Sequence, residues 1–373
     1  MRPHLIRAAT VALVCGVLAA ALNAPVQVGV RAAEALPARL SDAEFWALVE
    51  KLSEPEGNFP FDNLVSNETS IQSVIPALLN RTRPGGVYLG VGPEQNFTYI
   101  AALKPRIAFV IDIRRQNLVE HLMYKALFEL SDDRADFVSR LFSRKRPDSL
   151  DVNTSSAELF HAFGLAPAEP MLFEANLKAI VDNLTVRHHL PLTPRDLARL
   201  TFVYTSFFKD GPGLDYAPGD SVDLNGALPT YADLMSHTDG QGTAHSFLAS
   251  EAHYLFVKQL EGDNLLIPVV GDFGGPKAVR EIGRYLSDHG ATVTAFYLSN
   301  VERYLFDRRR SWRKFYDNVA TLPYDEQSLF IRAILNRPAS TLVTLLAPIP
   351  KLLKAIDDGR VHEYQDVFSI ANY

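Results

Sequence analysis

The feature that most constrains the fold is a strand–helix–strand pattern between residues 265 and 298. An apolar run at 265–272 is followed by a glycine turn, by apolar residues at helical spacing over 279–286, and by a second apolar run at 291–298. Helical spacing indicates a helix with one buried face, and short continuous apolar runs indicate buried strands. Pro276 suits the first position of the helix. Strands joined by a helix lie parallel, with a right-handed connection, so this segment predicts part of a parallel sheet.

A similar pattern precedes it in the chain. Residues 87–91 form a short apolar run that ends in a glycine-containing turn, 107–112 form a second run that ends in an aspartate, and a helix is expected over 116–130. Further strands are expected near 328–335 and 341–347. Alternating strands and helices predict an α/β fold with a doubly wound, mostly parallel, Rossmann-like sheet.

The remaining segments are expected to be mainly helical. Ser41 and Glu44 form a capping box and predict a helix that reaches Leu52, and a second helix is expected near 68–80. Residues 131–260 contain helical patterns interrupted by proline and glycine, which predict a large helical insertion. The expected division is a signal peptide, a first half of the core, the insertion and a second half of the core, at 1–33, 34–130, 131–260 and 261–373.

The N-terminal residues predict a leader and not a part of the fold. Arg2 and Arg7 precede an uncharged apolar stretch at 8–22, and small residues follow. This order is typical of a secretory signal peptide, and the stretch is short for a membrane-spanning helix. We therefore expect an exported protein, periplasmic or secreted. The alternatives are an uncleaved membrane anchor and a cytoplasmic protein with a later start.

Composition excludes several kinds of site. The chain has 373 residues, a formal net charge of −6 and one cysteine, Cys15. An acidic total does not favour a nucleic-acid-binding surface, and a lone cysteine in the leader excludes cysteine-rich zinc sites. Four other possible ligands match no compact zinc motif in their spacing, so no metal site is expected. They are His237, His245, Glu251 and His253.

The residues that most suggest chemistry follow the first two strands. Gly90 and Gly92 leave the backbone open to close approach by a small-molecule ligand. Asp112 ends the neighbouring strand about 20 residues later, and an acid at this spacing commonly binds the hydroxyl groups of a ribose. Two structural interpretations stay open: the glycines only form a tight turn, and Asp112 only caps the next helix or pairs with Arg114.

This arrangement resembles the cofactor site of class I S-adenosylmethionine-dependent methyltransferases. Residues 87–94 match the loop after the first strand, 109–112 match the end of the second strand, and 269–273 are similar to a later strand end. The chain also resembles a family of uncharacterised bacterial proteins with a methyltransferase-like core, over the stretches 62–68, 90–97 and 270–273. The resemblance implies a sheet of the methyltransferase type and S-adenosylmethionine as the cofactor.

The resemblance is incomplete at two positions. Tyr88 stands in place of the usual first acid, and Glu94 in place of the third glycine. Glu94 is therefore expected either to supply a relocated carboxylate for the amino group of the cofactor or to fill the site. The implied cofactor-binding residues are Gly90, Gly92, Glu94, Asn96, Asp112 and Asp272. The substrate candidates are Glu68, Tyr297, Ser299 and Asn300, and no catalytic residue is assigned.

Three functions fit these residues. The first is a methyltransferase-like protein with an unidentified acceptor. The second is an exported, non-catalytic binding protein for a nucleoside or another small molecule, which export would favour because S-adenosylmethionine is made and used in the cytosol. The third is a nicotinamide oxidoreductase, which is weaker because Gln95 stands where the dinucleotide fingerprint requires a glycine. The sequence contains neither a P-loop nor the Gly-x-Ser-x-Gly motif of hydrolases.

Overall fold

The computed structural model describes residues 35–216, 228–307, 311–336 and 341–371, all of which lie in one unit of the chain. The predicted leader and Cys15 lie outside the described residues. Among the described helices, none is long and apolar enough to cross a bilayer.

The described residues contain six strands in one mixed sheet, in the order β3-β2-β1-β4-β5-β6. They are β1 (Val87–Gly90), β2 (Ile107–Asp112), β3 (Leu266–Val270), β4 (Val293–Ser299), β5 (Leu329–Asn336) and β6 (Thr341–Pro348). The first five strands pair in parallel, and β6 pairs antiparallel with β5. The expected α/β class with a mostly parallel sheet is confirmed, and every expected strand is present.

The strand order reverses beside β1. The chain proceeds from β1 through β2 to β3 on one side, and β4 then pairs with the other side of β1. In open parallel sheets, ligands bind outside the carboxyl ends of the strands at such a reversal. The residues that follow β1, β2, β3 and β4 therefore meet at the edge where a ligand site is expected.

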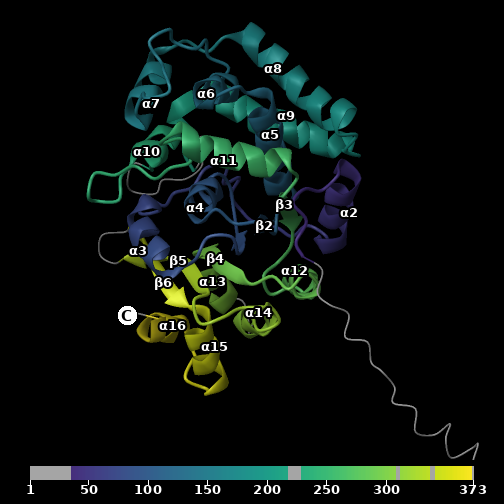
Figure 1. The fold of residues 1–373 in the computed structure, drawn as a ribbon, viewed down its shortest axis with the longest axis vertical. Helices are drawn as coiled ribbons and strands as arrows, with labels where there is room; N and C mark the ends of the chain where they lie inside the picture. Colours follow the sequence, from purple (N-terminus) through teal and green to yellow (C-terminus); the bar gives the residue numbers. More distant parts are fainter. Residues whose placement is uncertain (1–34, 217–227, 308–310, 337–340, 372–373) are drawn as a thin grey trace, which may run out of the picture. The chain divides into compact units, whose positions relative to one another are not determined.

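Helices cover both faces of the sheet (Figure 1). The connections between β1, β2 and β3 contain α4 (Gln95–Leu103) and α5 (Arg115–Leu130), and α12 (Ala278–Asp288) connects β3 to β4. Because the direction of winding changes after β3, right-handed crossovers place α12 on the face opposite α4 and α5. Phe109 of β2 packs edge-on against Tyr285 of α12, with ring centroids 5.9 Å apart.

The N-terminal and C-terminal helices complete these layers. The predicted capping box is present at α2 (Asp42–Leu52), where the Ser41 backbone N–H donates to Glu44 Oε2 at 2.8 Å. The C-terminal helices are α13 (Val301–Asp307), α14 (Ser311–Val319), α15 (Ile349–Asp357) and α16 (Tyr364–Ala371). Figure 1 shows α12 to α16 together on one side of the sheet, and most helices from the middle of the sequence on the other.

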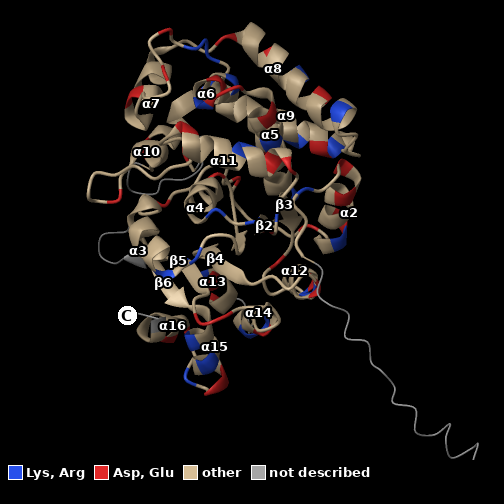
Figure 2. Ribbon diagram, in the orientation of Figure 1, with Lys and Arg blue, Asp and Glu red and all other residues tan. Residues whose placement is uncertain are grey.

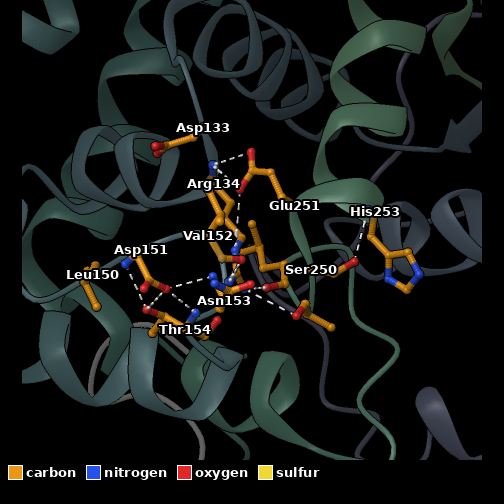
Figure 3. A network of polar contacts seen from close by, with 12 residues as sticks. Asp133, Arg134, Leu150, Asp151, Val152, Asn153, Thr154, Ser250, Glu251 and His253 are labelled. Carbon is orange, nitrogen blue, oxygen red and sulfur yellow. Dashed lines mark hydrogen bonds and ion pairs between the residues drawn. The ribbon is translucent and has the colours of Figure 1, made fainter.

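The segment between α5 and β3 is helical. Its elements are α6 (Arg134–Phe142), α7 (Ser156–Leu165), α8 (Pro170–Asp182), a π-helical turn η2 (Asn183–Arg187), α9 (Pro194–Asp210), a 3₁₀ turn η3 (Gly211–Gly213), α10 (Tyr231–Ser236) and α11 (Glu251–Gly262). The buried Arg134 side chain joins three parts of this segment, donating to the carbonyls of Leu248 at 2.9 Å and Val152 at 3.1 Å and pairing with Glu251 (Figure 3). Arg134 therefore fixes the start of α6 to the loop before α7 and to α11.

The outer helices carry charges of both signs. Lys178 pairs with Asp182 on α8, and Lys354 of α15 lies 3.1 Å from Asp358. Figure 2 shows Lys and Arg residues beside Asp and Glu residues on α2, α8 and α15. Exposed pairs one helical turn apart stabilise a helix by about 0.2–0.5 kcal/mol each, so these charges mainly support their own helices.

The second expected helix begins later than predicted. Residues 68–71 are not helical; a short 3₁₀ turn, η1 (Gln72–Val74), precedes α3 (Ile75–Arg81). The reason is a set of contacts distant in sequence: the Ser66 N–H donates to Glu94 Oε1 at 3.2 Å, and Tyr297 donates to Glu68. These bonds hold the chain at Glu68 against the sheet edge, so helical spacing in the sequence did not decide where the helix starts.

Candidate functional site

A cavity lies at the carboxyl edge of the sheet, where the strand order reverses. The cavity and its mouth together hold about 840 Å³ of space, a volume that includes open solvent. Its lining includes a residue at or just after the end of each of the four neighbouring strands β1, β2, β3 and β4: Gly92, Asp112, Asp272 and Ser299. The structure thus brings residues from both halves of the sheet to one site.

The turn after β1 forms the floor of this cavity. Gly92 has a φ of +79°, a conformation that glycine adopts without strain, and its carbonyl lies 2.9 Å from His121 Nε2. The buried Asn96 amide donates to the carbonyls of Val91, Gly92 and Pro93 at 2.8–3.0 Å. Asn96 therefore shapes the turn from below and is not among the residues that line the cavity.

Gly90 also supports the turn and does not line the cavity. A Cβ atom at this position would lie 1.9 Å from Asn96 Oδ1 and 2.8 Å from the Tyr88 hydroxyl. Tyr88 in turn donates to Asn96 Oδ1 at 2.9 Å. Gly90 is thus needed for the packing of these two side chains, and of the two expected glycines only Gly92 faces the site.

Asp112 lines the cavity and is paired with Arg114. Asp112 Oδ1 accepts from the backbone N–H and from Nε of Arg114, both at 2.9 Å, and Oδ2 accepts from Nη2 at 2.8 Å. The guanidinium also donates to the Asp62 carbonyl and lies over the Phe59 ring at 5.6 Å. A carboxylate oxygen has two acceptor positions, so Oδ2 keeps one for a ligand hydroxyl while Arg114 neutralises the charge.

Glu68, Tyr297 and Ser299 form a hydrogen-bonded cluster beside the end of β4. Tyr297 donates to Glu68 Oε1 at 2.7 Å, and Ser299 donates to the same oxygen. Glu68 and Ser299 line the cavity, as does Asn300, whereas Tyr297 lies behind them. Burial raises the pKa of Glu68 to about 7, although the bonds from Ser299 and Tyr297 oppose this shift. Three of the four expected substrate residues are therefore in mutual contact.

Glu94 lies in the core behind the turn and does not line the cavity. Its Oε1 accepts from the Ser66 N–H, and burial raises its pKa to about 8. Electrostatic repulsion links it to the buried Glu120, whose pKa burial raises well above its ordinary value. Glu94 is therefore largely protonated at neutral pH, and it contacts the lining of the cavity only through the backbone of Ser66 among the bonds found.

Asp272 lines the cavity on the side of β3. Its Oδ1 accepts from the Gly274 N–H at 2.9 Å, which closes a turn before α12. Phe59, Tyr216 and Tyr304 add an aromatic wall, with Phe59 and Tyr304 in edge-to-face contact at 5.5 Å. These rings were not predicted from the sequence, because they lie in loops and at a helix without any periodic pattern.

Within the described residues, no group of three or more His, Cys, Asp or Glu side chains is arranged to hold a metal ion. His245 Nε2 lies 2.9 Å from Asp239, and His253 Nδ1 lies 3.2 Å from the Ser246 carbonyl.

The chain matches the model of a protein family whose function is unknown. The model of a family described as a domain of unknown function (DUF7790) matches residues 63–155 and 189–351. These two stretches include the turn after β1, Asp112, Glu68 and the ends of β3 and β4. No curated protein matches the chain.

Proposed function

The chain belongs to the family of the domain of unknown function DUF7790, and we propose that it binds S-adenosylmethionine in the cavity at the sheet edge as a methyltransferase-like protein. The proposal includes the finer fold assignment, a doubly wound sheet of the methyltransferase type. The strand order supports it, because β1 lies at the reversal and is followed by the turn that faces the cavity.

One observation carries the proposal: Gly92, in the turn after β1, and Asp112, at the end of the neighbouring strand β2, line the same cavity. A ligand that crosses the Gly92 backbone meets no Cβ there, and its ribose has an acceptor at Asp112 Oδ2. Phe59 also lines the cavity, and an aromatic side chain there would pack against a planar base. These features together suit an adenosine group.

Methyl transfer from a sulfonium needs little covalent help from the protein. A lone pair of the acceptor forms a bond to the methyl carbon, and the electron pair of the broken C–S bond stays on sulfur. The protein contributes by holding acceptor and methyl group in line. The cavity provides polar groups at the β4 end for this purpose, namely Ser299 and Asn300.

The Asp112–Arg114 pair favours the second candidate function, a non-catalytic binding protein. Arg114 already occupies three acceptor positions of Asp112, so a ribose has one left. A weakened cofactor site would leave a ligand-binding domain with the same sheet and the same cavity. Both candidates share the prediction that an adenosine ligand binds, and they differ in whether methyl transfer follows.

Calorimetric titration of the purified chain with S-adenosylhomocysteine tests this proposal. We expect binding that Asp112→Asn weakens about tenfold or more, because an amide cannot replace a charged acceptor. Asp196→Asn is the matched control: Asp196 is a buried aspartate that forms a two-bond pair with Arg115 but does not line the cavity, so affinity should persist. Absence of binding, or a preference for a nicotinamide dinucleotide, contradicts the proposal.

A further inference from the structure

The strongest unexplained group in the cavity is the carboxyl of Glu68. Oε1 carries both hydrogen bonds of the cluster, from Tyr297 and Ser299. Oε2 is buried and has no hydrogen-bond partner among the described residues. Burying a carboxyl oxygen without a donor is costly, and such a group in a native protein calls for an explanation.

No cation of the chain accounts for this carboxyl. None of the ion pairs found among the described residues includes Glu68. The side chains that face it are neutral: Tyr297 from β4, Tyr88 from β1 and Tyr99 from α4, whose pKa values burial raises well above the ordinary value. Glu94 is a second buried carboxyl nearby. The ionised form of a buried carboxyl needs a positive partner, so the unpartnered Oε2 is a place where a cation would be bound.

The position of Glu68 indicates where that cation comes from. Asp112 lines the cavity at the end of β2, Gly92 follows β1, and Glu68 contacts the end of β4. Since β1 lies between β2 and β4, a ligand with its ribose at Asp112 extends over Gly92 toward Glu68. In S-adenosylmethionine the chain attached to the ribose carries the amino group.

We propose that Glu68 binds the cationic amino group of the adenosine ligand, and so supplies the carboxylate that Tyr88 and Glu94 do not provide. This inference rests on the proposed function. It makes the ligand class more specific: an adenosine whose 5′ chain bears an ammonium group. Oε2 accepts from that ammonium, while Tyr297 and Ser299 hold the carboxyl in place through Oε1.

The experiment compares two probes by calorimetry on the full chain. S-adenosylhomocysteine carries the amino group, and 5′-methylthioadenosine lacks it. We expect Glu68→Gln to lower the affinity for S-adenosylhomocysteine about tenfold or more, because a charge-assisted hydrogen bond is lost. The affinity for 5′-methylthioadenosine should change less than about twofold. Glu94→Gln is the matched control: it alters a buried carboxyl that does not line the cavity, and both affinities should persist.

A pH series provides a second readout. The ammonium binds the ionised form of Glu68, whose pKa is about 7 in the empty site. At about pH 5.5 only a few per cent of Glu68 is ionised, so S-adenosylhomocysteine should bind about tenfold more weakly than at about pH 7. Binding at the lower pH should also release a proton from Glu68. Glu68→Gln should abolish both effects and Glu94→Gln should keep them, which separates the two carboxyls.

Failure of the proposed function and failure of the Glu68 assignment give different results. If the wild-type chain binds neither probe, the proposed function itself is wrong and the role of Glu68 falls with it. If it binds both probes, and Glu68→Gln weakens them equally or weakens neither, the adenosine site stands and the assignment of Glu68 is overturned. Thermal unfolding of each variant shows whether it is folded, and the pH series on the wild type tests the assignment without any substitution.

Discussion

Tyr88, Gly90 and Asn96 form one packed unit beneath the turn after β1. The Asn96 side chain bonds to three successive carbonyls of the turn and accepts a bond from Tyr88, in space that Gly90 leaves open. The turn owes its shape to these bonds as well as to the positive φ of Gly92. Residues that do not line the cavity thus position Gly92, which does.

Gly90→Ala should disrupt this unit. The new methyl group would displace Asn96, since its carbon would lie 1.9 Å from Asn96 Oδ1. We expect a loss of about 1–3 kcal/mol in the free energy of unfolding, measured by urea denaturation. Gly164→Ala in α7 is the control: nothing lies within 4 Å of its new Cβ, so a gain of about 0.5–1 kcal/mol is expected. Equal effects at both sites would contradict this account.

The start of α12 depends on a residue from another element. Glu54, which follows α2, accepts through Oε1 from the backbone N–H groups of Lys277 at 3.1 Å and Ala278 at 2.7 Å. The first N–H groups of a helix have no partner within it, and a carboxylate there is favourable. The helix therefore begins at Ala278, and the expectation that Pro276 is its first residue is wrong.

Glu54→Ala should destabilise the protein by about 1 kcal/mol, because two helix N–H groups lose their acceptor. Thermal or urea unfolding measures the change. Glu50→Ala is the matched control, an exposed residue on α2 whose side chain does not reach α12 in the contacts found. A loss at Glu50 as large as that at Glu54 would show that capping of α12 is not the cause.

His188 joins α2 to α5. Its Nδ1 lies 2.8 Å from Asp42 Oδ1, and its Nε2 lies 2.6 Å from Glu129 Oε2. The bond to Glu129 raises the pKa of His188 against the effect of burial. Burial would raise the pKa of Glu129, but the bond from His188 and the charge of Lys125 outweigh it and lower that pKa to about 2. Both groups are therefore charged in mildly acidic solution.

The contribution of His188 to stability should decline as pH rises. A raised folded-state pKa gives stability that is fully present below the unfolded pKa of about 6.5 and is lost as pH rises through the folded pKa. The difference in unfolding free energy between the wild type and His188→Asn should therefore be larger at about pH 5.5 than at about pH 8.5. His189→Asn, at the exposed neighbour, should show no such trend. If the difference in unfolding free energy between the wild type and His188→Asn does not change with pH, the charged contacts of His188 with Asp42 and Glu129 do not stabilise the fold as described.

The sequence predicted elements better than it predicted the site. Continuous apolar runs at 87–91 and 107–112 predicted β1 and β2 closely because burial on both faces requires such runs. The sequence could not predict that Glu68 lines the cavity and Glu94 does not, since both are carboxyls near the first turn. Which of them lines the cavity depends on the Ser66–Glu94 bond and on Tyr297, contacts between segments far apart in the chain.

At the scale of the whole molecule, the sheet order brings together residues that the sequence separates by more than 200 positions, such as Glu68 and Ser299. Within the helical segment from α6 to α11, Arg134 joins α6 to α11, and the segment packs against α5 mainly through α9 and α11. Export by an N-terminal leader remains a prediction, and it bears on which adenosine ligand the protein meets.

A crystal structure of the chain with S-adenosylhomocysteine tests the central claim most directly, because it shows both the place and the orientation of the ligand. We expect the adenosine in the cavity over Gly92, the ribose within hydrogen-bond distance of Asp112, and the amino group beside Glu68. A ligand bound elsewhere, or a cavity filled by the chain's own side chains at saturating ligand, would contradict it.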